Sequence, residues 1–463
     1  MAERDFSHLS DVMGSLPMLK RYIVICLAFE LDDYQTTATD VETALKDALT
    51  RLASAFPFLT GQVVMEGRRE GHSGRPKIIP LQPTISLHSK DLRHDPEFPS
   101  MQQMRQAQYP ISMLNAEVLS PAIAVSWSSE GFENTAPVFM LQTNFVRGGL
   151  ILTVAGNHMT MDMTGLGMVI SLLSKACLAE QFSEEEIQQG NRSRGDAVPL
   201  LGEDYEPGPE LDDAYMKPRA TEEKNNPSPT SEPTTTFSLP HPPPKWVYFN
   251  FGASALSTLK RQASNQTITP YISTDDAVGA LCWQGISRAR ALRLGDQVRT
   301  VFARPISARK YLGLQGLYIG HMVDMVYSTA TDVHAHPLGP TAGRLRSLLL
   351  EDAKITQHVR AFATMLDRLD DKSVLVNGAC LDPQRDIVLS SYANIRCCEL
   401  SFGPVLGRPD AARRPSMPPW PSLCYLMPKS RAGDIAVALC LSEVDIAALR
   451  SDKAFTEFAE YVG

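Results

Sequence analysis

The chain has 463 residues, of which 43% are hydrophobic and 21% charged, and its formal net charge is −8. This balance is typical of a folded globular protein and argues against disorder over most of the length. The length exceeds what one ordinary core accommodates, so we expect two domains of roughly 200 residues each. The negative charge and the lack of a basic stripe argue against a nucleic-acid binder, which needs positive charge to attract phosphates.

The sequence lacks membrane-spanning, secretory and CxxC segments, and these absences bear on the location of the protein and on the state of its cysteines. No run of about eighteen apolar residues is present to span a bilayer, and the start MAERDFSHLS lacks the layout of a secretory signal. We therefore expect a cytoplasmic protein with no membrane partner. The eight cysteines are scattered and none forms a CxxC pair, so we expect buried free thiols rather than disulfides or a zinc site.

The N-terminal part predicts a strand followed by a helix. Residues 19–31, LKRYIVICLAFEL, are rich in β-branched and aromatic side chains and predict a strand. The next segment predicts a helix, because Leu45, Leu49 and Leu52 recur at three- and four-residue spacing and Asp40 can cap its start.

Residues 138–156 predict a hairpin of two adjacent strands separated by the Gly148-Gly149 pair. The segment after it predicts a helix with one apolar face. That face is made of Leu166, Val169, Ile170, Leu173 and Cys177.

A change of composition divides the chain. Residues 203–245 carry many prolines, serines, threonines and charges with few large apolar side chains, which predicts a linker. After it come a strand and a helix, and then a second helix that Ser273 or Thr274 caps, with Asp275 and Asp276 suited to the helix dipole. We therefore expect an α/β (α+β) protein with one domain over residues 1–202, the linker over 203–245 and a second domain over 246–463.

The stretch GNHMTMDMTG, residues 156–165, places His158 and Asp162 on the connection between a predicted strand and a predicted helix. A metal site would need a third and usually a fourth ligand, and the neighbourhood supplies none. A dinucleotide fingerprint would need a third glycine, but Ile170 stands in that place. A serine hydrolase would need a GxSxG elbow, which the chain lacks.

Two interpretations of His158 remain open from the local sequence. The histidine can act as a general base on an incoming hydroxyl or amine, with Asp162 fixing the local backbone. It can equally be a hydrogen-bonded core residue without chemistry. Nothing in the residues around it decides between these interpretations.

The sequence resembles the BAHD-type acyl-CoA-dependent acyltransferases, because HMTMD fits their HxxxD signature. LKDALTRLASAFPFLTGQV is similar to the first helix of that family and its following turn. LSSYANIRCCELSFGPVLGRPDAARRPSM resembles the second family motif, DFGWG, and keeps Phe402, Gly403 and Gly407. NFVRGGLILTV, STDDA and the ending YVG resemble the fungal trichothecene 3-O-acetyltransferase branch. The resemblance covers nearly all of the chain outside the linker.

The resemblance implies two chloramphenicol acetyltransferase-like domains joined by a long crossover linker, with His158 in the middle of a channel between them. Acyl-CoA, expected to be acetyl-CoA, would enter as a co-substrate from one face and a small alcohol from the other. His158 would take the alcohol proton as the oxygen attacks the thioester, without a covalent acyl-enzyme. Asp162 would point away from the substrate and hold the loop, often against an arginine. No permanently bound cofactor and no metal are expected.

Two departures from the family pattern concern an ion pair. Ser401 stands where the DFGWG motif has its aspartate, and Phe302 takes the acidic position before Arg304 in a VDxR-like pattern. The usual partner of Arg304 is therefore expected to be missing. We interpret this as altered scaffolding or a source of weakened activity.

Candidates for contacting CoA are of two kinds. Arginine suits bidentate phosphate contacts, although a solvated surface charge is the alternative for each. The basic candidates are Arg304, Arg309, Lys310, Arg408, Arg413 and Arg414. Ser390 and Ser391 are candidates for lining the pantetheine tunnel, by their place before the second motif. Trp283, Tyr392 and Trp420 are interpreted as core residues rather than acceptor-stacking groups.

We therefore expect a monomeric acyl-CoA-dependent O-acyltransferase, with acetyl-CoA as donor, that acts on a hydroxyl of a fungal secondary metabolite. A trichothecene-like terpenoid, a polyketide and an alkaloid are the acceptor classes considered. Two alternatives stay open. One is a weakly active paralogue that binds a metabolite, and the other is a CoA-independent catalyst of condensation, cyclisation or ester hydrolysis on the same scaffold.

Overall fold

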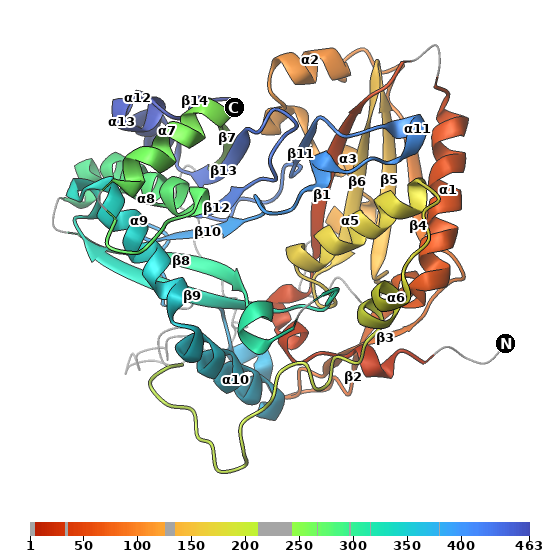
Figure 1. Ribbon diagram of the computed structural model, residues 1–463, viewed down its shortest axis with the longest axis horizontal. Helices are drawn as coiled ribbons and strands as arrows, with labels where there is room; N and C mark the ends of the chain where they lie inside the picture. The colour runs from red at the N-terminus through yellow and green to blue at the C-terminus, as the bar shows by residue number, and fades with distance from the viewer. Residues whose placement is uncertain are drawn as a thin grey trace, which may run out of the picture.

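Two β-sheets, each covered by helices, form the two halves of the molecule (Figure 1). The computed structural model describes residues 5–32, 36–125, 135–211, 243–265, 267–295, 298–314, 316–378 and 380–463. In the view of Figure 1 the first sheet stands on the right beside α1 and α5, and the second lies on the left beneath α7, α8 and α9. This mixed architecture confirms the expected fold class.

The first sheet has five strands in the order β11-β1-β6-β5-β4. Its strands are β1 (Tyr22–Glu30), β4 (Ser86–Asp91), β5 (Phe139–Val146), β6 (Gly149–Asn157) and β11 (Ala411–Arg413). β5 and β6 form an antiparallel hairpin that turns at Gly148, where φ is 75°, so the predicted hairpin is confirmed. Every residue of both strands is buried, and the hairpin therefore gives a rigid base to the loop after β6.

Two helices pack together on one face of this sheet, α1 (Ala38–Ala55) and α5 (Met163–Cys177). The predicted apolar face of α1 is confirmed, since Leu45, Leu49 and Leu52 are buried. The prediction that Asp40 caps this helix was wrong. Thr37 is the N-cap, and its side chain and that of Asp40 bind each other's backbone N–H groups in a capping box.

The second sheet has seven strands in the order β14-β7-β13-β12-β10-β8-β9. They are β7 (Lys245–Phe251), β8 (Arg299–Ser307), β9 (Val323–Thr331), β10 (Ile387–Ser391), β12 (Leu423–Leu426), β13 (Ile435–Leu441) and β14 (Glu460–Tyr461). The neighbouring helices are α7 (Ala253–Ser264), α8 (Thr274–Leu294), α9 (Leu338–Ser347) and α12 (Glu443–Ser451). Ser273 caps α8 in a capping box with Asp276, which confirms one of the two predicted caps.

Shorter elements complete the described chain. A separate two-stranded sheet pairs β2 (Gly61–Glu66) with β3 (Arg75–Pro80). The other helices are α2 (Met101–Gln106), α3 (Ala116–Leu119), α4 (Ala122–Val125), α6 (Glu184–Gly190), α10 (Asp352–Arg368), α11 (Gly403–Leu406) and α13 (Lys453–Thr456). Turns of 3-10 helix lie at Ser7–Leu9, Met13–Ser15, Pro17–Leu19, Pro57–Thr60, Ile111–Met113, Arg309–Leu312, Val333–Ala335, Leu348–Leu350, Lys372–Val374 and Cys397–Glu399.

One strand joins the two halves. β11 follows β10 in the chain, yet it pairs with β1 in the first sheet, where Arg413 lies opposite Cys26. Residues 203–211 of the predicted linker contain no helix or strand, and residues 212–242 lie outside the described part of the chain. The division at residues 202 and 246 stays a prediction, and β11 shows that the second half contributes a strand to the first sheet.

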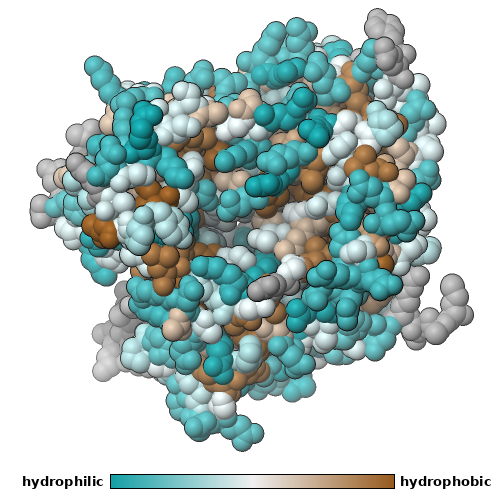
Figure 2. Space-filling model, in the orientation of Figure 1, coloured by the Kyte–Doolittle hydropathy of each residue, from teal (hydrophilic) through white to brown (hydrophobic). Residues whose placement is uncertain are grey.

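Hydrophilic side chains cover most of the face seen in Figure 2, with small hydrophobic patches between them. Among the described helices, none is long and apolar enough to cross a membrane. The cysteines are free thiols, as predicted, but Cys380 is exposed and Cys177 only half-buried. The prediction that the thiols are buried was therefore wrong for Cys380.

Candidate active site

His158 directly follows the last residue of β6, at the start of the connection to α5. Its backbone N–H donates to the carbonyl of Arg21, 2.8 Å away, just before β1 begins. Four residues later Asp162 caps α5, because its Oδ1 accepts the backbone N–H of Gly165 at 2.8 Å. The motif is therefore a tight loop between a buried strand end and a capped helix start.

The imidazole of His158 is held in one tautomer. Its Nδ1 lies 3.1 Å from the carbonyl oxygen of Met161. A carbonyl oxygen only accepts, so Nδ1 carries the hydrogen and Nε2 keeps its lone pair. Burial lowers the pKa of His158 well below its usual 6.5, and His321 and Arg21 lower it further. At neutral pH the ring is uncharged and can accept a proton.

A second histidine, His321, lies beside the first. The two ring centroids are 5.1 Å apart, and Nδ1 of His321 is 3.2 Å from the carbonyl oxygen of His158. Burial lowers the pKa of His321 to about 4, so this ring is neutral as well. Sequence reasoning missed His321, because it stands alone just before β9 and belongs to no motif.

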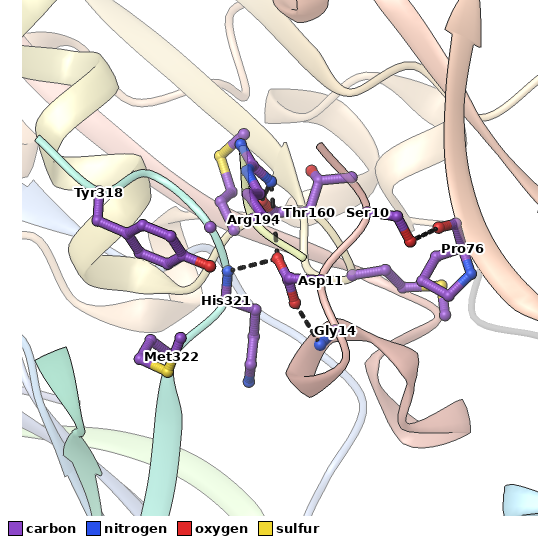
Figure 3. Close-up of polar contacts among 12 residues, drawn as sticks. Ser10, Asp11, Gly14, Pro76, Thr160, Arg194, Tyr318, His321 and Met322 are labelled. Carbon is purple, nitrogen blue, oxygen red and sulfur yellow. Dashed lines mark hydrogen bonds and ion pairs between the residues drawn. The ribbon is translucent and has the colours of Figure 1, made fainter. Parts of the chain in front are cut away.

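The N-terminal segment supports the same loop through Asp11, as Figure 3 shows. Its carboxylate accepts the backbone N–H groups of Gly14, at 2.6 Å, and of His321, at 3.3 Å. Arg194 lies 3.7 Å from Asp11 and donates to the carbonyl of Thr160, inside the motif, at 2.7 Å. Burial raises the pKa of Asp11 to about 6. Three distant segments therefore meet at the loop that carries His158.

The carboxylate of Asp162 binds Arg309. The guanidinium donates to both carboxylate oxygens, at 2.8 and 3.0 Å, and Met322 N–H donates to Oδ2 at 2.8 Å. Burial alone would raise the pKa of Asp162, but the charge and hydrogen bonds of Arg309 outweigh it and the pKa is lowered. Arg309 also donates to the carbonyls of Tyr318 and Gly320. The candidacy of Arg309 for CoA phosphate was therefore wrong, because this side chain is buried in the loop support.

Arg304 likewise has an internal partner. It is buried, and its guanidinium lies 2.7 Å from a carboxylate oxygen of Asp276 on α8, which Arg346 also binds. The candidacy of Arg304 for CoA phosphate is corrected on this ground. Phe302, in the position where the family has its acidic residue, is packed in the core 5.5 Å from the ring of Trp283. Asp276 thus supplies the negative charge that Ser401 and Phe302 lack.

The remaining basic candidates differ in exposure. Arg408 and Lys310 are exposed, and Lys310 lies 3.7 Å from Asp352. Arg413 is buried and its guanidinium lies over the rings of Tyr109 and Tyr248, which removes it from phosphate in solvent. The CoA role of Arg413 is therefore corrected, and that of Arg408 stays a prediction.

Ser390 and Ser391 point to opposite faces of β10, because side chains alternate along a strand. The Ser391 hydroxyl donates to Asp275 at the start of α8. Ser390 is therefore directed to the face away from α8, on which Tyr425 of β12 contributes to the pocket of His158. The tunnel-lining role stays a prediction for Ser390, and the contact with Asp275 argues against it for Ser391.

The second motif, which contains Phe402, Gly403 and Gly407, packs against β1. Phe402 is buried against Phe29, with ring centroids 5.4 Å apart, and its N–H donates to the carbonyl of Gly407 at 2.7 Å. Gly403 and Gly407 have φ of 82° and 69°, a region that favours glycine. A Cβ on Gly403 would lie 2.7 Å from the carbonyl oxygen of Cys177 at the end of α5. These contacts support the structural role that the resemblance implies for the motif.

A pocket lies beside His158. Its other lining residues with polar or aromatic side chains are Arg21, Tyr22, Ser120, Tyr392, Arg414, Ser416, Trp420 and Tyr425. The interpretation of Trp420 as a core residue was wrong, since it lines the pocket and is 36% exposed. Tyr392 is buried in the hydrophobic core, as expected, and also borders the pocket. Trp283 is fully buried, as expected.

Within the described residues, no three His, Cys, Asp or Glu side chains gather as a metal ion would require. A larger pocket is lined by residues of β8, β9 and α10. It contains His358 bound to Asp324 at 2.8 Å but not His158. His158 is thus a neutral imidazole beside a pocket, with an Nε2 lone pair that can accept a proton.

Comparison with known proteins agrees with this geometry. Residues 21–177 match the trichothecene 3-O-acetyltransferase-like N-terminal domain, and residues 113–456 match the Transferase family. The O-acetyltransferase dmxR13 of Cryptosporiopsis sp. (strain 8999) is 39% identical over 98% of this chain and 97% of its own. The trichothecene 3-O-acetyltransferase TRI101 of Fusarium sporotrichioides is also 39% identical, over 98% of this chain and 96% of its own.

Solved structures give the same result. The crystal structure of Fusarium graminearum TRI101 complexed with coenzyme A and T-2 mycotoxin has a TM-score of 0.88 and 36% identity, covering 98% of this chain and 99% of that one. Vinorine synthase shares the fold, with a TM-score of 0.65 and 14% identity over 99% of this chain and 95% of its own. The chain therefore belongs to the Transferase family, in its trichothecene 3-O-acetyltransferase-like group, and is an acyltransferase.

Proposed function

We propose that this enzyme transfers an acetyl group from acetyl-CoA to a hydroxyl of a small fungal metabolite, with His158 as general base. The observation that carries the proposal is the state of the imidazole. Its Nδ1 is bound to the carbonyl of Met161 and its pKa is held well below 6.5, so Nε2 is available for a proton at neutral pH. A histidine in this state is suited to general base catalysis.

The transfer needs a single protonation cycle of His158. Nε2 takes the acceptor proton while the acceptor oxygen attacks the thioester carbonyl, which forms a C–O bond and a tetrahedral oxyanion. The oxyanion collapses, the C–S bond breaks, and the CoA sulfur leaves with the proton that the imidazolium returns. The products are the acetyl ester and CoA, and no covalent acyl-enzyme forms.

Asp162 is a positioning residue in this scheme. Its carboxylate is occupied by Arg309, Met322 and Gly165, so it fixes the loop rather than exchanging a proton with the imidazole. The tautomer of His158 is instead set by the carbonyl of Met161.

The relatives support CoA as co-substrate and a small alcohol as acceptor. The Fusarium graminearum relative has been solved with coenzyme A and T-2 mycotoxin, and with coenzyme A and deoxynivalenol. The acceptor of this chain, its monomeric state and its cytoplasmic location stay predictions. Lys310, Arg408, Arg414 and Ser390 are the residues that we retain as candidate CoA contacts.

The test is an acetyl-transfer assay of the purified enzyme. Release of the CoA thiol from acetyl-CoA is followed with a panel of polycyclic fungal alcohols, and products are identified by mass spectrometry. The proposal predicts acetyl esters in amounts equal to the thiol released. Conversion of a panel member without any acyl-CoA would contradict it in favour of a CoA-independent catalyst, and bound metabolite without turnover would favour a binding paralogue.

A further inference from the structure

The N-terminal segment, residues 5–19, is anchored to the rest of the protein independently of its buried carboxylate, Asp11. The backbone carbonyl of His8 accepts the N–H of Arg194 at 2.9 Å. The segment also packs apolar side chains into the core, namely those of Phe6, Leu9, Met13, Leu16 and Leu19. A charged side chain is therefore not needed to hold this segment in place.

Asp11 and Arg194 nevertheless form a buried ion pair. Their charged atoms are 3.7 Å apart, and the two side chains are only 3% and 2% exposed. Burial raises the pKa of Asp11 to about 6, although the charge of Arg194 opposes this, and the carboxylate is therefore ionised at neutral pH. Burial of two charges costs much of their hydration free energy, and an apolar pair of similar size is often at least as stable. Stability alone therefore does not account for this pair.

The Asp11 carboxylate acts on the loop of His158 through His321. Its Oδ2 accepts the backbone N–H of His321 at 3.3 Å, and Nδ1 of His321 lies 3.2 Å from the carbonyl oxygen of His158. Asp162 accepts the N–H of the next residue, Met322, at 2.8 Å. The two carboxylates therefore fix consecutive peptide groups of the segment whose imidazole contacts His158.

Arg194 acts on the same loop from within the motif. The Nη atom that faces Asp11 also donates to the carbonyl of Thr160 at 2.7 Å. This carbonyl belongs to the peptide group that joins Thr160 to Met161, and the carbonyl of Met161 lies 3.1 Å from Nδ1 of His158. The placement of the Arg194 guanidinium therefore bears on the carbonyl that sets the tautomer of the base.

We propose that Asp11 is a positioning residue of the active site, which acts through Arg194 and His321 to hold His158 in its Nδ1–H form with Nε2 available to the acceptor. Loss of the Asp11 charge loosens the loop, and the imidazole then changes its orientation or its tautomer, which slows proton transfer. The N-terminal segment is thus part of the catalytic apparatus. The inference rests on the proposed function of His158 and adds a residue outside the HxxxD motif.

The test compares Asp11→Asn with a matched variant of the neighbouring residue. Asparagine keeps the size of the side chain and removes its charge. Ser10→Ala removes a hydrogen bond from the same segment to the carbonyl of Pro76, outside the loop (Figure 3). In acetyl transfer from acetyl-CoA, Asp11→Asn should lower kcat about tenfold or more with an unchanged KM for acetyl-CoA, because a misplaced base loses rate rather than binding. Ser10→Ala should retain the wild-type kcat.

The same substitution in a His158→Ala background separates positioning of the base from general damage. If Asp11 acts through His158, Asp11→Asn should cause no further loss of rate once the imidazole is removed. Loss of the same factor in both backgrounds would overturn the inference. A wild-type kcat for Asp11→Asn alone would overturn it as well.

A further variant covers the case in which Asp11→Asn does not fold, since that substitution leaves the buried charge of Arg194 without its partner. The double variant Asp11→Asn, Arg194→Gln contains neither charge and should show the same loss of kcat. A folded double variant with the wild-type kcat would contradict the inference.

The ring nitrogens of His158 provide a readout that needs no turnover. When histidine is labelled with a nitrogen isotope, the magnetic-resonance signals of His158 are those that disappear in His158→Ala, and their chemical shifts distinguish the two tautomers. The wild type should show the Nδ1–H form and Asp11→Asn a mixture, whereas identical shifts would overturn the inference. Absence of acetyl transfer by the wild type would contradict the proposed function, and these shifts would still test the role of Asp11.

Discussion

The carboxylate of Asp162 and the guanidinium of Arg309 form a two-pronged pair, with distances of 2.8 and 3.0 Å, although 147 residues separate them in the chain. The same carboxylate caps α5 and accepts the backbone N–H of Met322 just before β9. The side chain of Asp162 therefore connects α5, which packs on the first sheet, to the segment just before β9 of the second sheet. The loop with His158 lies at this junction.

Asp162→Asn should destabilise the fold more than it changes the chemistry. The amide can still cap α5, but it leaves the buried charge of Arg309 without its counter-ion, which costs about 3–5 kcal/mol in comparable cases. The free energy of unfolding in urea measures the loss. Lys46→Gln breaks an exposed pair with Glu42 and should change it by less than about 0.5 kcal/mol. Equal losses of unfolding free energy in the two variants would show that the buried pair contributes no more to stability than the exposed pair.

Gly14→Ala should disturb the His158 loop from outside the motif. A Cβ on Gly14 would lie 2.0 Å from the backbone oxygen of Met159, the residue after His158, so one of the two backbones must move. We expect a loss of about 1–3 kcal/mol in stability, together with a lower kcat. Gly195→Ala is the matched control, because nothing lies within 4 Å of its added Cβ. The account is contradicted if the two variants have the same melting temperature and kcat.

The pH dependence of kcat/KM should reflect the lowered pKa of His158. The base works only when unprotonated, and burial holds its pKa well below 6.5. The acid limb of the profile should therefore have its midpoint below pH 6.5, with a plateau through neutral pH. Steady-state rates between pH 4.5 and 8 measure it, and a midpoint at or above 6.5 would contradict the assigned environment.

His321 should make the fold sensitive to acid. Its pKa is about 4 in the folded protein against 6.5 for an ordinary histidine, so between these values the unfolded chain binds the proton more strongly. The contribution of His321 to the free energy of unfolding has its full value above pH 6.5 and falls by about 3 kcal/mol as the pH approaches 4. The advantage of wild type over His321→Gln in unfolding free energy should therefore shrink by that amount from pH 7 to pH 4. A difference in unfolding free energy that stays constant from pH 7 to pH 4 would contradict this prediction.

The local part of the site could be predicted from sequence, and its long-range part could not. The period of apolar residues places His158 and Asp162 between a strand and a helix, because periodicity is a property of neighbouring residues. Which arginine binds Asp162 depends on the three-dimensional path of the chain. For this reason the sequence alone does not separate Arg309 from surface cations, and it does not reveal that Asp276 binds Arg304.

The pocket shows the same limit on what local patterns predict. Trp420 has no sequence feature that separates a pocket wall from a core, and the crossing of β11 to the first sheet brings Arg414 to the pocket that His158 lines. His321 likewise reaches the site through contacts with the His158 carbonyl and with Asp11. Side chains that meet across two sheets leave no mark on the spacing of either segment.

The measurement that tests the central claim most directly compares wild type with His158→Ala in acetyl transfer from acetyl-CoA, under conditions where both have the same melting temperature. Removal of a general base should lower kcat/KM by about 10²–10⁴-fold, while binding of the acceptor is retained. A His158→Ala variant that keeps the wild-type rate would show that His158 is part of the scaffold and that another group takes the proton.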